Sequence, residues 1–347
     1  MPIRVVDPAA PDPGVIAEAA RLIRAGALVA FPTETVYGLG ANALDERAVR
    51  RIFAAKGRPS YNPLIAHVAD VAGAQALVTR WPDAADRLAR AFWPGPVTLV
   101  LPKRAVVPDV VTAGLPAVGV RMPAHPVALA LLAAAEVPIA APSANRFTEL
   151  SPTQARHVEK ALGERVELIL DGGATTVGIE STVVDLTGAR PVLLRPGTVA
   201  PDALAAVLGE VPAPAAEPVD AEAPRLSPGM VERHYAPRAA VWPFAPGEQA
   251  AIARRLAALV GAAGEGAGTP PAPPAPRVGA LLLSPWRAHP LPDIPLPMPG
   301  EPEGYARRLY AALHHLDDEG CDVALVEWPP DEPAWAGVRD RLARAAR

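Results

Sequence analysis

Short runs of valine, leucine and isoleucine, bounded by glycine or proline, alternate with amphipathic stretches over the first 200 residues of the chain. Such runs are typical of buried β-strands. We expect strands at Ala27–Phe31, Leu64–Val68, Val97–Leu101, Ala117–Arg121, Val137–Ala141, Val166–Leu170, Ser181–Leu186 and Val192–Arg195. Apolar residues at helical spacing predict helices over residues 45–56, 126–136 and 152–162. Strands interleaved with helices in this way favour an α/β domain with a mixed sheet.

The ends of two predicted helices carry boundary signals. Gly57 follows the helix at 45–56 and is a favourable stop, because glycine adopts the left-handed conformation of a helix end at little cost. Ser151, Pro152 and Gln154 form a start signal, with serine expected at the N-cap. We therefore expect Ser151 to cap the helix at 152–162. A helix N-terminus also attracts anions, so Ser151 is a candidate anion ligand as well.

A second, smaller unit follows a proline-rich connection. Residues 212–228 are rich in Pro, Ala and Glu without periodicity, which is typical of a linker. Beyond it, the pattern predicts strands at Val278–Leu283 and Val323–Val326, helices at 248–260, 303–319 and 334–346, and a low-complexity loop at 261–276. The predicted organisation is a catalytic domain at 1–207, a linker or lid at 208–238, and a small Rossmann-like α/β domain at 239–347.

Composition and charge narrow the class of protein. Half of the residues are hydrophobic and 20% are charged, which provides enough apolar material for packed cores and excludes general disorder. The single cysteine, Cys321, excludes a disulfide framework, and we expect it to be a small buried hydrophobe. The net charge of −4 argues against a general nucleic-acid coat protein. We expect a cytoplasmic protein without membrane association, because we find neither a secretory signal nor an apolar run of about 18 residues.

Candidate chemistry is concentrated in the first half of the chain, where all three lysines and all three asparagines lie before residue 165. Lys56 and Arg58 flank the predicted helix stop, and Asn62 follows before the next strand. The compact charge of a lysine ammonium group and the planar set of donors of an arginine guanidinium are together suited to binding phosphate oxygens. The alternative is that cations favour helix C-termini for electrostatic reasons alone. His67, on the next predicted strand, is explained equally well as a core histidine.

Other polar residues lie where predicted strands end, which is where open α/β sheets bind ligands. Arg121 closes one apolar strand. Because an unpaired buried guanidinium is costly, we expect it to meet a carboxylate, either of the protein or of a substrate. Small polar and charged residues mark the ends of three more strands, at Ser143 and Asn145, at Ser181, and at Arg195.

Several well-known site patterns are missing from the sequence. It contains no Walker motif, no H-E-x-x-H and no G-x-S-x-G, and its seven histidines lack metal-ligand spacing. We therefore assign no protein side chain to a metal. The stretch Gly38–Ala43 matches the dinucleotide pattern G-x-G-x-x-A, but the residues about 20 further on are basic where an acid would bind ribose. This disfavours a nicotinamide-dependent enzyme.

Eight motifs follow one another in the first 200 residues: PTETVYGLG, KGRP with NPL, WPGPVTLVL, GVRMP, APSAN, SPT, GIESTVVDL and RPG. In this order they resemble the YrdC-like threonylcarbamoyl-AMP synthases, with their twisted α/β domain. The later SPGMVERHYAP, from Ser227 to Pro237, is similar to the linker signature of the family's long, two-domain form. The loop at 146–149 departs from the family's usual Ser-Gly pair, although Ser143, Asn145 and Ser151 keep their spacing.

The resemblance implies an activity and a set of site residues. L-threonine, bicarbonate and ATP would give L-threonylcarbamoyl-AMP and pyrophosphate, with Mg²⁺ carried on the ATP. The product would serve formation of N6-threonylcarbamoyladenosine in tRNA, with tRNA involved only indirectly, through a downstream tRNA-modifying transferase. The resemblance implies threonine binding by Thr35, His67, Arg121, Ala141 and Ser181. It implies ATP binding by Arg58, Asn62, Ala117, Ser143, Ser151 and Arg195, and a catalytic set of Lys56, Arg58, Ser143 and Asn145.

The chemistry of this reaction agrees with the residues. A carbamate is a weak, negatively charged nucleophile that must attack the α-phosphate of a polyanion, so cations are needed to offset the repulsion and align the reactants. Lys56, Arg58 and Arg195 fit that role, and Arg121 suits a carboxylate as a two-pronged donor. The alternative function is an RNA-binding or translation-linked module without catalysis, against which the first domain's net charge of +1 argues.

The segment Ser227–Pro237 is predicted to be a lid. It contains Met230, Arg233, His234 and Tyr235, which are bulky or polar residues that a solvated spacer does not need. Closing over the first domain, it would exclude water from a labile carbamate and adenylate. His234 and Tyr235 are accordingly predicted to lie at the ATP site. The alternative is that the segment packs on the second domain as an ordinary interface strand.

Overall fold

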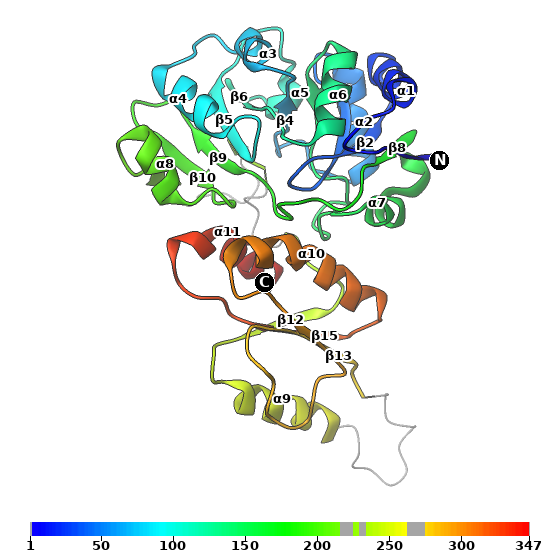
Figure 1. Ribbon diagram of the computed structural model, residues 1–347, viewed down its shortest axis with the longest axis vertical. Helices are drawn as coiled ribbons and strands as arrows, with labels where there is room; N and C mark the ends of the chain where they lie inside the picture. Colours follow the sequence, from blue (N-terminus) through cyan, green and yellow to red (C-terminus); the bar gives the residue numbers. More distant parts are fainter. Residues whose placement is uncertain (1, 216–224, 229–233, 262–274, 347) are drawn as a thin grey trace.

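The computed structural model describes residues 2–215, 225–228, 234–261 and 275–346, and its strands form two separate sheets (Figure 1). The first sheet has the strand order β1-β8-β2-β3-β7-β4-β6-β5-β9-β10-β11. Its strands are β1 (Ile3–Val5), β2 (Val29–Pro32), β3 (Tyr37–Asn42), β4 (Ile65–His67), β5 (Val97–Pro102), β6 (Ala117–Arg121), β7 (Ile139–Ala140), β8 (Leu168–Asp171), β9 (Thr182–Asp185), β10 (Val192–Arg195) and β11 (Ala213–Pro214). Parallel pairs such as β4 with β6 and antiparallel pairs such as β2 with β3 occur together, which confirms the mixed sheet.

Helices cover this sheet in two groups. They are α1 (Pro13–Arg24), α2 (Glu46–Lys56), α3 (Val71–Leu77), α4 (Asp83–Phe92), α5 (Asp109–Thr112), α6 (Pro126–Ala135), α7 (Ala155–Leu162) and α8 (Pro201–Leu208). Helices α1 and α6 pack on each other and share one apolar cluster with β2 and β8. The other helices contribute to a larger cluster with β3, β5 and β6. The strand ends between these two clusters carry the polar residues of the site.

The second domain is a parallel sheet of the order β12-β15-β13-β14. Its elements are β12 (Ala240–Phe244), α9 (Gln249–Gly261), β13 (Val278–Leu282), β14 (Ile294–Pro297), α10 (Pro302–Asp318), β15 (Val323–Glu327) and α11 (Ala336–Ala345). Ala280 and Leu282 pack with residues of α9, whereas Leu281 packs with residues of α10 and α11, as the alternation of a strand requires. Helices α10 and α11 lie on the face of this sheet that is turned toward the first domain (Figure 1).

Most of the predicted elements are present, but five strands were not predicted: β1, β3, β11, β12 and β14. Strands β6 and β10 have the predicted bounds, and Gly57 ends α2 with a left-handed φ of 63°. Strand β3 includes most of the stretch Gly38–Ala43 that matched the dinucleotide pattern. Gly40 is needed there because a Cβ atom would lie 2.7 Å from the Phe31 ring. Gly38 and Gly40 lie within an antiparallel strand, which agrees with the rejection of the dinucleotide-binding interpretation of this stretch.

The predicted start of α7 is also wrong. The helix begins at Ala155, with Gln154 at the N-cap, and Ser151 lies before it, outside any regular element. The hydroxyl of Ser151 donates to Glu180, a residue of a distant loop, and does not cap the helix. A local start signal was overridden because the tertiary structure supplied a buried charged acceptor.

The two domains share one apolar core. Val36, Leu150 and Ile179 of the first domain pack with residues of α10 and α11. Glycines permit close backbone approach at this interface: a Cβ atom on Gly337 would lie 2.3 Å from the carbonyl oxygen of Gly197. The second domain is therefore held firmly against the strand ends of the first.

Some expectations fall on residues that the structure does not describe. Residues 216–224 and 229–233, which include Met230 and Arg233, and residues 262–274 of the predicted loop lie outside the described ranges. Cys321 is buried, as expected. In the described part of the chain, none of the helices has the length and apolar character to cross a membrane.

Candidate active site

A small cavity of about 50 Å³ opens where strand ends of the first sheet meet the segment that connects the domains. Ten of the fifteen site residues that we predicted line it, namely Thr35, Arg58, His67, Arg121, Ala141, Ser143, Ser181, Arg195, His234 and Tyr235. Its wall also includes Thr33, Val36, Gly38, Ile65, Pro142, Glu180 and Pro228.

One end of the cavity is formed by the neighbouring strands β4 and β6. The strands are parallel, and their register pairs His67 with Arg121, so both side chains lie at the same sheet edge. Burial, and then the charge of Arg121, lowers the pKa of His67 to about 3. The imidazole is therefore neutral at physiological pH. Its Nδ1 atom is buried and has no hydrogen-bond partner among the described residues.

Arg121 meets a carboxylate of the protein. Its Nη2 donates to Glu34 Oε1 at 2.6 Å, and its Nε donates to the carbonyl oxygen of Gly95 at 3.2 Å. Glu34 Oε2 in turn accepts from the backbone of Ala124. Both charged side chains are almost fully buried. The pair fixes the orientation of the guanidinium and leaves its Nη1 without a protein partner in the described structure.

Arg58 enters the cavity from the end of α2. The left-handed Gly57 turns the chain, and the Arg58 side chain donates from Nε to the Asn62 carbonyl at 3.3 Å and from Nη2 to the Pro63 carbonyl at 3.0 Å. Burial lowers the pKa of Arg58 to about 10, so the group remains charged at neutral pH. No carboxylate in the described part of the chain forms an ion pair with Arg58. Its remaining donors are available to a ligand.

Arg195 lies opposite, at the end of β10. Its Nε and Nη2 donate to the backbone and hydroxyl oxygens of Ser181, each at 3.1 Å, and its Nη1 donates to the carbonyl oxygen of Pro228 at 3.1 Å. The Ser181 hydroxyl also lies 2.8 Å from that of Thr98. Like Arg58, Arg195 is buried without an ion-pair partner among the described residues.

Lys56 is engaged behind the wall of the cavity. Its Nζ donates to the backbone oxygens of Ser143 and Asn145 and contacts the Asn145 side-chain oxygen at 3.4 Å. Burial, followed by the charge of Arg58, holds the pKa of Lys56 well below its ordinary value of 10.5. The structure thus uses Lys56 to fix the loop that presents Ser143 to the cavity.

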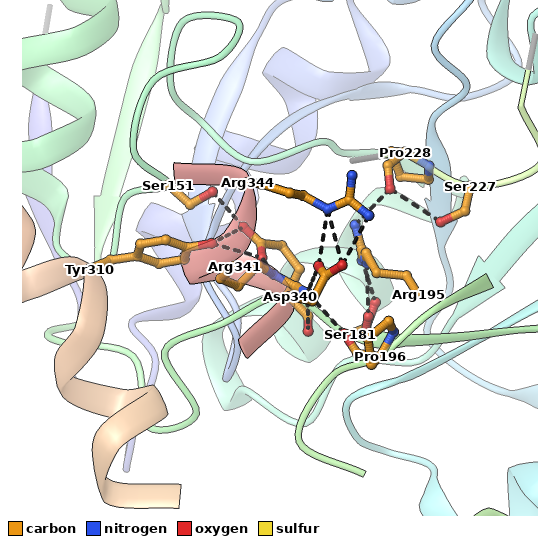
Figure 2. A network of polar contacts seen from close by, with 11 residues as sticks. Ser151, Ser181, Arg195, Pro196, Ser227, Pro228, Tyr310, Asp340, Arg341 and Arg344 are labelled. Carbon is orange, nitrogen blue, oxygen red and sulfur yellow. Dashed lines mark hydrogen bonds and ion pairs between the residues drawn. The ribbon is translucent and has the colours of Figure 1, made fainter. Parts of the chain in front are cut away.

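Glu180 brings a negative charge to the cavity wall. Its carboxylate accepts from the Ser151 hydroxyl, from the Tyr310 hydroxyl at 3.1 and 3.3 Å, and from Arg341 Nε at 2.7 Å. Figure 2 shows these donors converging from both domains. Burial alone would raise its pKa, but the charges of Arg341 and Arg195 hold the pKa of Glu180 below its ordinary value. Glu180 is therefore an anion whose oxygens are already occupied.

The connecting segment closes the cavity with His234 and Tyr235. The His234 backbone donates to the Arg344 carbonyl, and its ring lies edge-on to Phe147, 5.6 Å away. Tyr235 has a positive φ of 61°, and its ring lies 5.9 Å from that of Tyr310. These two residues both line the cavity and pack on the second domain. The lid interpretation of Ser227–Pro237 and the interface interpretation therefore each describe part of their contacts.

Five predicted site residues lie outside the cavity wall: Lys56, Asn62, Ala117, Asn145 and Ser151. All five are buried, and four of them contact or support a residue that does line it; Ala117 packs against Val183 and has no such contact. Sequence reasoning missed Glu34, Glu180 and Arg341. Glu34 and Glu180 stand inside the quoted motifs, where the need for a carboxylate partner was a usable signal. Arg341 has no local signal.

The described residues offer no group of three or more His, Cys, Asp or Glu side chains arranged to hold a metal ion. The cavity's carboxylate, Glu180, is already paired with Arg341. A donor set of guanidiniums, hydroxyls and one neutralised carboxylate does not suit a resident cation.

Fold and cavity together define a two-domain α/β protein with a buried cationic site suited to a small polyanionic ligand. Residues 21–197 match the Sua5, YciO and YrdC family model, described as telomere recombination, and residues 199–347 match that of the threonylcarbamoyl-AMP synthase C-terminal domain. The chain belongs to the threonylcarbamoyl-AMP synthase family.

Full-length relatives and a solved structure agree with this placement. The chain is 46% identical to the threonylcarbamoyl-AMP synthase of Pyrococcus abyssi, over 94% of this chain and 93% of that one. It is 40% identical to the Bacillus subtilis enzyme of the same name, over 99% and 96% of the two chains. The crystal structure of P. abyssi Sua5 complexed with L-threonine superposes with a TM-score of 0.89 at 43% identity, covering 100% of this chain and 98% of that chain.

Proposed function

We propose that this protein condenses L-threonine, bicarbonate and ATP to L-threonylcarbamoyl-AMP and pyrophosphate. The observation that carries the proposal is the pair of buried guanidiniums, Arg58 and Arg195, that face one cavity without carboxylate partners in the described structure. An excess of fixed positive charge in a buried site is costly unless a polyanion binds there. The product is a nucleotide adduct, so the enzyme is a nucleotidyltransferase.

Threonine is proposed to bind at the end of the cavity that contains His67 and Arg121. Its carboxylate would take the free Nη1 of Arg121, which Glu34 holds in place. The neutral imidazole of His67 retains a buried, unpartnered nitrogen for the amino acid. Thr35, Ala141 and Ser181 complete this pocket with small side chains, which suit a substrate of threonine's size.

ATP is proposed to bind between Arg58, Ser143 and Arg195. The two guanidiniums would contact phosphate oxygens directly, as planar forks suited to that geometry. Asn62 lies behind Arg58 and keeps a buried side-chain nitrogen without a partner among the described residues. Ala117 lines no part of the cavity, so its assignment rests on the family resemblance alone. Lys56, Asn145 and Ser151 are proposed to act by positioning the wall.

The reaction then needs alignment more than side-chain chemistry. The threonine ammonium group first loses a proton, and the neutral amine then combines with bicarbonate to give a carbamate and water. A carbamate oxygen attacks the α-phosphorus, and the bond to pyrophosphate breaks. Arg58 and Arg195 offset the charge of the two anions, which is the main contribution a protein makes to such transfers. His67 is neutral in the folded protein, so it would orient the substrate through hydrogen bonding without acting as a cation.

Magnesium is proposed to arrive with ATP as part of the substrate. Glu180 is the one carboxylate residue in the described wall of the cavity, and its oxygens are taken by Ser151, Tyr310 and Arg341. Phosphate oxygens and water would therefore complete the coordination of the ion.

His234 and Tyr235 are proposed to close over bound ATP. Both rings lie at the cavity wall, and the charges of Arg58, Lys56 and Arg195 act on the His234 imidazole. Burial, followed by the charge of Arg58, holds its pKa well below the ordinary value, so it adds no further positive charge. The labile product would pass to a tRNA-modifying transferase in the cytoplasm, without contact between this protein and tRNA.

The experiment is a pyrophosphate-release assay on the full-length protein with Mg²⁺ and ATP. We expect release only when threonine and bicarbonate are both present, and a product with the mass of threonylcarbamoyl-AMP. Reactions lacking either compound are the matched controls. Release that is independent of threonine would contradict the proposal. Absence of release together with binding of RNA would favour a non-catalytic role in translation.

A further inference from the structure

Arg341 of α11 reaches from the second domain to the wall of the candidate active site. Its side chain is fully buried. Nε donates to Glu180 Oε2 at 2.7 Å, Nη2 donates to the Glu180 carbonyl at 3.3 Å, and Nη1 donates to the Pro196 carbonyl at 2.9 Å (Figure 2). The guanidinium carbon also lies 5.2 Å from the centre of the Tyr235 ring. One residue of the second domain thus contacts two residues of the cavity wall, Glu180 and Tyr235, and the backbone next to a third, Arg195.

These three contacts lie at or beside the ATP site that we propose. Glu180 lines the cavity together with Arg58 and Arg195. Pro196 directly follows Arg195, so the bond to its carbonyl holds the backbone beside that guanidinium. Tyr235 belongs to the segment that closes the cavity. Arg341 itself does not line the cavity, so it acts on ATP through these neighbours.

The charge of Arg341 determines whether the wall at Glu180 presents a net negative charge to a bound polyanion. Tyr310 and Ser151 donate neutral hydrogen bonds to Glu180, and Arg341 is its ion-pair partner in the described structure. Without Arg341, a buried carboxylate would face the triphosphate and would also attract Arg195 away from it. With Arg341, the two cations Arg58 and Arg195 remain free for the ligand.

We propose that Arg341 is a positioning residue for ATP, through which the second domain neutralises Glu180 and completes the nucleotide part of the cavity. This inference rests on the proposed function. It assigns the second domain a specific role in the chemistry of the first. It also predicts that the role depends on charge balance with Glu180 and is separable from simple packing.

The test compares four variants of the full-length protein: Arg341→Met, Arg341→Lys, Arg341→Met with Glu180→Gln, and Arg308→Met as the matched control. Arg308 is an exposed arginine of α10 in the same domain, with no described side-chain contact. Binding of a non-hydrolysable ATP analogue with Mg²⁺ is measured by calorimetry. The KM values for ATP and threonine are measured by pyrophosphate release, and folding is monitored by near-ultraviolet circular dichroism.

We expect Arg341→Met to weaken ATP binding on the order of 10-fold, which corresponds to about 1.4 kcal/mol, and to leave the KM for threonine within about twofold. The double variant should regain most of the lost affinity, because a neutral glutamine no longer repels the phosphates. Arg341→Lys should keep the charge and show a smaller defect than Arg341→Met. Arg308→Met should behave as the parent protein.

A double variant that folds and binds ATP no better than Arg341→Met would overturn the inference. So would equal rises in both KM values, which would indicate a general structural defect. If Arg341→Met does not fold, the double variant decides alone: parent-like ATP binding supports charge compensation, and weak binding refutes it. Calorimetric binding of the analogue remains readable if pyrophosphate release fails, so the two proposals fail separately.

Discussion

Replacing Arg58 with methionine removes one of the two unpaired cations from the candidate active site. The side chain is 8% exposed, and it makes two hydrogen bonds, to the carbonyl oxygens of Asn62 and Pro63. Methionine has a similar length and fills the same space without charge. The substitution therefore separates the contribution of the charge from that of the side-chain volume.

The magnitudes follow from these contacts. A preorganised donor aimed at developing charge contributes about 2.7–4 kcal/mol, or 10²–10³ in rate, so kcat should fall by that factor. The two lost hydrogen bonds contribute about 0.5–1.5 kcal/mol each to folding. Removal of a buried charge offsets part of this loss, so unfolding free energy should fall by less than about 3 kcal/mol. Activity should thus be lost while the protein remains folded.

The assay is steady-state pyrophosphate release, with urea unfolding measured on the same preparations. Arg47→Met is the matched control, because Arg47 is an exposed arginine of α2 with no described side-chain contact. Turnover of folded Arg58→Met within threefold of the parent would refute the role of Arg58 at the phosphates. A loss of activity in Arg47→Met as well would point to an effect of net charge.

Three further outcomes are expected. Arg121→Lys keeps the charge but loses the fork, so the KM for threonine should rise far more than that for ATP; equal rises would place Arg121 elsewhere. Lys56→Met should lower kcat with both substrates still bound, because the loop carrying Ser143 loses its anchor; unchanged kcat would exclude this positioning role. Burial lowers the pKa of His157 from 6.5 to about 3. Below pH 6.5 the unfolded chain binds a proton that the folded protein does not, so this histidine should reduce stability by about 1.4 kcal/mol per pH unit as the pH falls. His157→Asn should flatten that slope in urea unfolding at pH 7, 6 and 5, and an unchanged slope would contradict it.

The sequence determined much of the first domain, because strands and helices follow from local patterns. The run ending at Arg121 predicted β6 with its observed bounds, and Gly57 correctly marked the end of α2. Polar residues at strand ends converge in an α/β sheet, so the positions of Arg121 and Arg195 in one cavity followed from their places on the strands. Strand β3 was not predicted because its glycines are required by the size of the Phe31 ring, which lies on another strand.

Only the tertiary structure determined which charged side chains are bonded to protein groups and which face the cavity. The sequence shows Lys56 and Arg58 as equal candidates, but burial against backbone carbonyls engages the lysine and leaves the arginine facing the cavity. Likewise, nothing local connects Glu180 with Arg341, which is 161 residues away along the chain. Pairing of buried charges depends on which surfaces meet when two domains pack. That information lies in the contact between distant segments, and no periodicity or motif records it.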